Sequence, residues 1–157
     1  MSNILLDKYP LLFEQRNDEP YITYGIECLP GWNNILDNAF KLMYKDYKWA
    51  LITLKDAQSR DSSSTDYKLR IEKQQAQVAD ELSKLPIIMQ VKEKFGTLRI
   101  YADNTNEYHK GVIAMAEAMS ELTCEECGSS GELDRRRWHI RTLCKHHLDE
   151  KYSTYNI

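Results

Sequence analysis

The stretch IIMQVKEKFGTLRIYA (residues 87–102) decides the fold class. Two strand-like runs, at 87–94 and 97–102, flank the pair Phe95-Gly96. Glycine supplies the positive φ that tight hairpin turns need, so the pattern predicts a β-hairpin over about residues 87–102. A hairpin needs further elements to cover one of its faces, and the sequence on either side contains patterns for such elements.

Helical patterns lie on both sides of this hairpin. Apolar residues recur at steps of three and four between residues 33 and 85, interrupted by the polar stretch SRDSSST (59–65). Two amphipathic helices with a polar connection predict a long αα-hairpin over about 33–85. A third helix, over about 106–123, is predicted from the stripe of Val112, Met115, Ala116, Met119 and Leu122.

Shorter signals complete the predicted fold. Residues 4–13 read as a short amphipathic helix interrupted at Pro10, and residues 21–26 read as a strand. Asn104, followed three residues later by Glu107, predicts the N-cap of the third helix. The sequence therefore predicts an α+β fold. A small antiparallel sheet that includes the hairpin is packed by helices in a domain over 1–123, and a second module covers 124–157.

Composition excludes some classes of protein. The formal net charge is -3, which provides no overall field for binding a polyanion. No window approaches 18 uninterrupted apolar residues, so no transmembrane helix and no membrane partner are expected. The first twelve residues lack a basic leader and do not resemble a signal peptide. We expect a cytoplasmic protein, in which clustered cysteines are more often metal ligands than disulfides.

Two short pairs of soft ligands form the sharpest motif. Cys124 and Cys127 are separated by two residues and followed by Gly128, and Cys144 and His147 repeat the same spacing. Three thiolates and one imidazole suit tetrahedral Zn²⁺, and four protein ligands leave no open position for catalysis. The sequence thus predicts a structural zinc knuckle at the C-terminus. His146 is an alternative fourth ligand, and the remaining cysteine, Cys28, is interpreted as a small buried hydrophobe.

A basic cluster lies between the two ligand pairs. It could contact phosphates or an acidic protein surface, with its tryptophan stacking on a base. Acidic residues in the same segment favour a solvated loop with balanced charges, and both interpretations stay open. The candidate binding residues are Arg135, Arg136, Arg137, Trp138 and Arg141.

A second cluster lies on the predicted hairpin. Lys92, Lys94, Arg99 and Tyr101 occupy alternate positions, so they are expected to share one polar face of a two-stranded ribbon. Such a face suits an anionic ligand, for example a cyclic nucleotide. A half-exposed hairpin with cross-strand ion pairs is the other interpretation.

The sequence holds no P-loop, no GxGxxG after a strand and no GxSxG. The two ligand pairs are similar to those of zinc-bearing HNH endonucleases. However, the segment between them holds only His139 and no asparagine, so it lacks the catalytic set of that class. We therefore expect a protein that is not an enzyme.

Three segments together resemble a group of small proteins found in bacteriophages and prophages. They are ECLPGW (27–32), QVKEKFGTLRIY (90–101), and CEECG (124–128) with WHIRTLCKHH (138–147). The resemblance implies a phage-encoded accessory protein that acts in the bacterial cytoplasm by stoichiometric binding, with a host protein or defence component as partner. A zinc regulator that binds nucleic acid and a sponge for a nucleotide signal are the alternatives.

Overall fold

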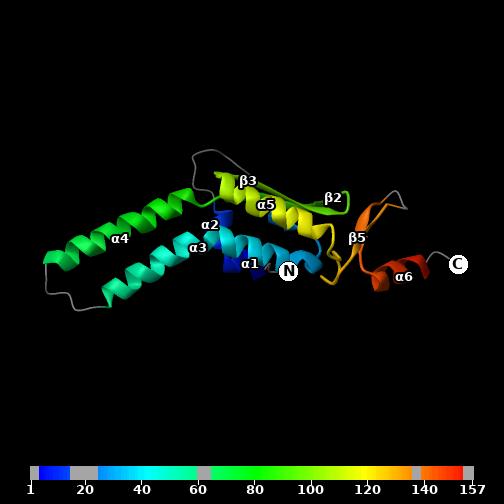
Figure 1. The fold of residues 1–157 in the computed structure, drawn as a ribbon, viewed down its shortest axis with the longest axis horizontal. Coiled ribbons are helices and arrows are strands. Elements are labelled where there is room, and N and C mark those ends of the chain that lie inside the picture. The colour runs from blue at the N-terminus through cyan, green and yellow to red at the C-terminus, as the bar shows by residue number, and fades with distance from the viewer. Residues whose placement is uncertain (1–3, 15–24, 60–64, 136–138, 154–157) are drawn as a thin grey trace.

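The computed structural model describes residues 4–14, 25–59, 65–135 and 139–153 and has the predicted α+β class. The elements are α1 (Ile4–Lys8), α2 (Pro10–Phe13), β1 (Gly25–Glu27), η1 (Pro30–Trp32), α3 (Asn33–Gln58), α4 (Thr65–Lys84), β2 (Ile87–Lys94), β3 (Thr97–Asp103), α5 (Glu107–Ser120), β4 (Glu132–Asp134), β5 (Arg141–Leu143) and α6 (Lys145–Ser153). Figure 1 shows an elongated molecule. Much of α3 and α4 extends to one side, β2, β3 and α5 lie in the middle, and β5 and α6 lie at the far end.

The predicted β-hairpin is confirmed. Strands β2 and β3 pair antiparallel, with Val91 opposite Ile100, and both turn residues have positive φ, 54° at Phe95 and 76° at Gly96. Two consecutive positive φ angles are typical of the type I′ turn, whose twist matches that of the strands. Strand β1 pairs parallel with β2, with Ile26 opposite Val91, so the three-stranded sheet is mixed and not wholly antiparallel as the sequence predicts. The predicted strand at 21–26 falls partly outside the described residues.

The predicted αα-hairpin is also confirmed, because α3 and α4 run side by side in opposite directions (Figure 1). Helix α3 buries Met43, Ala50 and Ala57 along this part of its length. No residue of α4 between Asp66 and Lys84 is fully buried. We refer to these paired helices, where they project beyond α5, as the arm.

The core lies beneath the sheet. Val91, Leu98 and Ile88 come from the inner faces of β2 and β3 and are fully buried. They cluster with Leu36 and Phe40 of α3, with Trp32 of η1, with Leu12 of α2 and with Tyr9, which lies between α1 and α2. Burial of these large side chains is the main stabilising term for the domain.

Helix α5 protects the open edge of β3. The side-chain oxygen of Ser120 accepts a hydrogen bond from the backbone N–H of Leu98 at 2.9 Å, and Glu117 Oε1 accepts one from Ile100 at 3.0 Å. Unpaired strand edges invite pairing with other chains, and these two bonds satisfy donors that would otherwise be exposed.

The predicted N-cap of α5 is wrong. Asn106 caps the helix, and its side chain accepts from the backbone of His109, whose Nδ1 in turn accepts from the Asn106 N–H. Asn104 instead adopts φ 52° and donates from its side-chain amide to the carbonyl oxygens of Ser83 and Leu85 at 2.8 Å. It therefore serves the end of α4 rather than the start of α5.

Candidate metal centre and adjoining surfaces

The structure brings the four predicted ligands together. One ligand atom each from Cys124, Cys127, Cys144 and His147 lies within 4.8 Å of the others. His147 Nδ1 is 3.3 Å from both Cys124 Sγ and Cys144 Sγ, and Cys127 Sγ is 3.8 Å from Cys144 Sγ. This cluster of three sulfurs and one nitrogen could hold a metal ion.

Local geometry explains how the two pairs meet. After Cys127 the chain reverses at Gly128, which has φ 77° and donates from its N–H to the carbonyl oxygen of Cys124 at 2.9 Å. Cys144 directly precedes α6, so His147 follows within the first turn of that helix. Pairing of β4 with β5 holds the two halves of the segment together.

The fourth ligand in the cluster is His147 and not the alternative, His146. The side chain of His146 is 72% exposed, and its Nε2 lies 3.4 Å from Glu150 Oε1. Successive residues of a helix point in different directions, so only one of the two histidines faces the sulfurs.

The cysteines of the cluster differ in their electrostatics. Hydrogen bonds from the side chain and backbone of Ser129 lower the pKa of Cys127 to about 6. Burial raises the pKa of Cys124, which has no exposed surface. A thiolate at Cys127 near neutral pH is the form that binds a cation.

The cluster is docked tightly on the sheet domain. The Gly31 N–H donates to the carbonyl oxygen of Glu125 at 2.9 Å, and the indole Nε1 of buried Trp32 donates to that of Thr123 at 2.8 Å. At the hairpin tip, Thr142 Oγ1 donates to the carbonyl oxygen of Gly96 at 2.6 Å. Residues 27–32, 90–101 and 123–142 thus contribute to one junction.

A cavity of about 370 Å³ opens at this junction, and we call it the junction cavity. Glu125 is only 2% exposed. Its Oε1 accepts a hydrogen bond from Arg141 Nε, while its buried Oε2 has no hydrogen-bond partner. Burial raises the pKa of this carboxyl. The other lining residues include Glu27, Cys28, Leu29, Glu93 and His139.

Cys28 stands apart from the metal cluster. It is partly buried, it packs against the hydrophobic core, and burial raises the pKa of its thiol to about 12. A neutral, partly buried thiol agrees with its interpretation as a small hydrophobic residue and is unsuited to nucleophilic attack.

The predicted hairpin face is brought together by the sheet register. Lys92 lies directly opposite Arg99, and the Lys92 Nζ lies 5.0 Å from the centroid of the Tyr101 ring. Lys94 alternates with Lys92 along β2, so all four residues share the face that turns away from the core residues Val91 and Leu98. Binding of an anionic ligand to this face stays a prediction.

Part of the predicted arginine cluster lies outside the described residues, namely Arg136, Arg137 and Trp138. Arg135 is exposed. Arg141 is directed inward, where its guanidinium pairs with Glu125 and, at 2.8 Å, with Glu126. Its charge is therefore balanced within the junction, and phosphate binding by the cluster stays a prediction.

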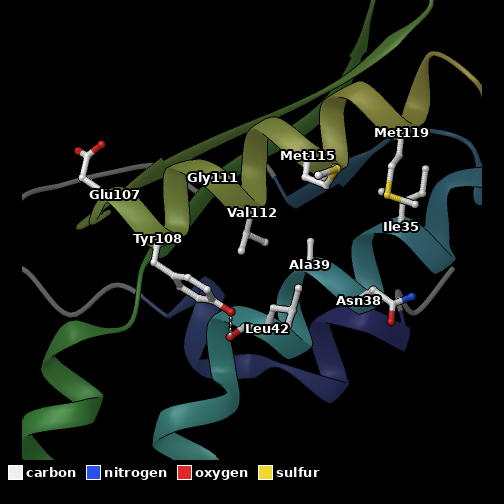
Figure 2. Close-up of a pocket in the computed structure, with 11 residues that line it drawn as sticks. Ile35, Asn38, Ala39, Leu42, Glu107, Tyr108, Gly111, Val112, Met115 and Met119 are labelled. Atoms are coloured by element: carbon white, nitrogen blue, oxygen red, sulfur yellow. Dashed lines mark hydrogen bonds between the residues drawn. The ribbon is translucent and has the colours of Figure 1, made fainter.

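One surface was missed by the sequence reasoning. Between α3 and α5 lies a groove of about 430 Å³, and Figure 2 shows Leu42, Met115 and Met119 directed into it. These three side chains are 45%, 63% and 49% exposed. Of the stripe that predicted α5, only Val112 and Ala116 are buried. The sequence did contain a signal for this groove, because apolar residues surround most of α5. Such a helix has more apolar surface than one contact with the core can cover.

Comparison of the chain with protein-family models, curated proteins and solved structures finds no match. Its own geometry is therefore the basis for proposing a function. Within the described ranges, no helix has both the length and the apolar character needed to cross a lipid bilayer.

Proposed function

We propose that this chain is a non-catalytic protein that binds a partner protein stoichiometrically through the groove between α3 and α5. The observation that supports this is the exposure of Leu42, Met115 and Met119 along a concave surface. Large exposed apolar patches are typical of interaction sites, and methionine side chains adapt to different partner shapes.

The lining of the groove indicates the chemistry of the partner. Among the lining residues that the structure describes, only Glu107, at the start of α5, carries a charge, and Lys110 pairs with it at 2.8 Å. A charged partner segment would be desolvated there without compensation, so the occupant is a segment that presents apolar side chains. Tyr108, whose hydroxyl donates to the Leu42 carbonyl oxygen at 3.4 Å, closes one end (Figure 2).

The biological setting follows from the resemblance to phage and prophage proteins. It supports a phage-encoded accessory protein in the bacterial cytoplasm, with a host protein or defence component as the partner. Anti-defence activity or host takeover would then result from occupancy of the partner rather than from turnover.

The metal in this proposal is a structural zinc ion. Three sulfurs and one imidazole nitrogen match the tetrahedral Cys₃His set of structural zinc sites. The surrounding segment has a small core of Cys124, Leu143 and Leu148, so metal binding would supply much of its folding free energy. Zinc would hold the junction rather than catalyse a reaction.

Capture from bacterial lysate with matched variants tests the groove. Met115→Glu places a charge in the groove, whereas Leu69→Glu changes a leucine of α4 that is 68% exposed. We expect a specific protein to be retained by the wild type and by Leu69→Glu and lost by Met115→Glu. Equal capture by all three would refute the assignment. A Met115-dependent dimer in size-exclusion chromatography would show that a second copy occupies the groove instead.

The opposition of Lys92 and Arg99 favours a second candidate, an anion site on the outer face of the sheet. This candidate predicts that a cyclic nucleotide raises the melting temperature of the wild type, since ligands of the folded state stabilise it by mass action. Arg99→Gln should abolish the shift, while Lys110→Gln on α5 should leave it intact. No shift in the wild type would reject this candidate.

A further inference from the structure

An unsatisfied acceptor lies beside the junction cavity. Glu125 Oε2 is buried without a hydrogen-bond partner, although the side chain lines a cavity of about 370 Å³. A buried acceptor left unpaired is costly, so native proteins satisfy such groups in most cases. The missing partner must be a hydrogen-bond donor.

The charges around the cavity specify a cation. Three carboxylates line it, those of Glu27, Glu93 and Glu125. Arg141 is the one arginine or lysine in the described lining, and it is shared with Glu126. Glu27 accepts from the Gln90 amide and Glu93 from the backbone N–H of Gly96, but neutral donors do not balance a negative charge. A cationic donor would compensate both the charge and the unpaired oxygen.

The spacing of these carboxylates argues against a metal ion. Within the described part of the chain, the side chains close enough to share an ion form two groups, Cys124, Cys127, Cys144 and His147 and then His146, His147 and Glu150. Neither group includes a carboxylate of the junction cavity. A larger cation with several N–H donors spans such a separation, whereas one small ion does not.

We infer that the junction cavity binds an organic cation whose guanidinium group donates hydrogen bonds to Glu93 and Glu125. A guanidinium presents five donors in a planar fork that fits carboxylates, and it is more weakly hydrated than an ammonium ion. Leu29 and the neutral thiol of Cys28 supply an apolar wall for its flat face. The terminal torsion of a glutamate is soft, so Oε2 can turn toward a bound donor.

The inference does not depend on the α3–α5 groove. The same guanidinium chemistry could come from a free guanidino metabolite or from an arginine side chain in a peptide. Agmatine represents the free metabolite, and N-acetyl-arginine amide represents the peptide source. The stronger binder of the two identifies the source.

Amide NMR on the metal-loaded full chain provides the test. The Gly96 N–H donates directly to Glu93 Oε1 at 2.6 Å, and the Gly31 N–H donates to the Glu125 carbonyl oxygen, so both report on the cavity. We expect saturable shifts of these two resonances with at least one probe, and no shifts with sodium chloride at matched ionic strength. Absence of saturable shifts for both probes would overturn the inference.

Two variants and a control test the residues. Glu93→Gln keeps an acceptor for Gly96 but removes a charge, and it should weaken binding by at least about tenfold. Glu125→Gln should do the same. Glu121→Gln, the same change at the exposed C-cap of α5, should have no effect. Unchanged affinity in Glu93→Gln would also overturn the inference, and this variant decides the matter if Glu125→Gln does not fold.

Discussion

The backbone of Gly31 lies directly against the backbone of Glu125. Their N–H and carbonyl oxygen are joined at 2.9 Å, and a Cβ atom on Gly31 would lie 2.5 Å from the Glu125 carbonyl carbon. No side chain fits between the two segments. The metal-binding segment is therefore held against the sheet domain by backbone contact, and glycine at position 31 is what permits it.

Gly31→Ala should destabilise the protein. The new methyl group would clash with backbone atoms, including the Cys124 carbonyl oxygen, which cannot move aside as the end of a side chain can. Overpacking of this kind costs about 1–3 kcal/mol. Urea unfolding of the metal-loaded protein measures the change.

Gly111→Ala is the matched control for that variant. A Cβ atom at Gly111 would have nothing within 4 Å, and the residue lies inside α5. Alanine should stabilise the helix by about 0.5–1 kcal/mol. Equal stability of the two variants would contradict the close approach at Gly31.

Removal of the metal should loosen the junction. Metal analysis should find about one zinc ion per chain, and Cys124→Ser should release it. The indole N–H of Trp32 donates to Thr123, the residue before Cys124, so its NMR resonance should shift when zinc is lost. Cys28→Ser, which changes a thiol outside the cluster, should retain zinc. A protein that is stably folded without metal would contradict the structural role.

Ser120→Ala should be destabilising despite its small change in volume. Ser120 is fully buried, and its Oγ accepts from Leu98 and donates to the Glu117 carbonyl oxygen at 2.6 Å. Alanine would leave the Leu98 N–H unpaired at the sheet edge, at a cost of about 1–3 kcal/mol. Ser83→Ala removes a comparable bond to Asp80 on the exposed side of α4, and a change below about 0.5 kcal/mol is expected there. Chemical denaturation compares the pair.

Stability should fall in mild acid because of His109. Burial lowers the pKa of this imidazole, and the nearby Asp46 carboxylate offsets that effect only in part. The unfolded chain then binds the proton more readily. The free energy of unfolding therefore decreases as the pH falls below about 6.5 and levels off below the folded pKa.

His109→Gln isolates this effect. Glutamine at the same position can still accept from the Asn106 N–H and complete the capping box, but it does not titrate. Melting temperatures at several pH values should show a smaller acid-induced drop in the variant than in the wild type. Parallel curves would mean that His109 contributes nothing to the pH dependence.

Patterns between residues close in sequence correctly predicted the hairpin and the cluster of metal ligands. The alternation around Phe95-Gly96 predicted the hairpin and its turn, and the repeated spacing of Cys124, Cys127, Cys144 and His147 predicted the cluster. Both depend on residues near one another in the sequence. The cap at Asn106 was missed because a second asparagine, Asn104, lies close to it in the sequence. Asn104 differs by its positive φ, which depends on how α4 meets β2 and not on a local pattern.

Long-range features were not predictable in the same way. The contact between Gly31 and Glu125 joins distant segments, and neither has a periodicity that points to the other. Met115 and Val112 belong to one apolar stripe, yet only Val112 reaches the core. Periodicity shows that a face is apolar, but the packing of α3 against α5 determines which part of it is covered.

The arm is a part of the fold in which the chain could be lengthened or shortened. It lies within the connection between the parallel strands β1 and β2, and its two helices leave and re-enter the domain side by side (Figure 1). Whole turns could be added to or removed from both helices at their far end without changing the register of the sheet, the junction or the metal cluster. The far end of the arm is therefore a natural insertion point for a fluorescent or affinity tag, and it leaves the proposed binding surfaces unmodified.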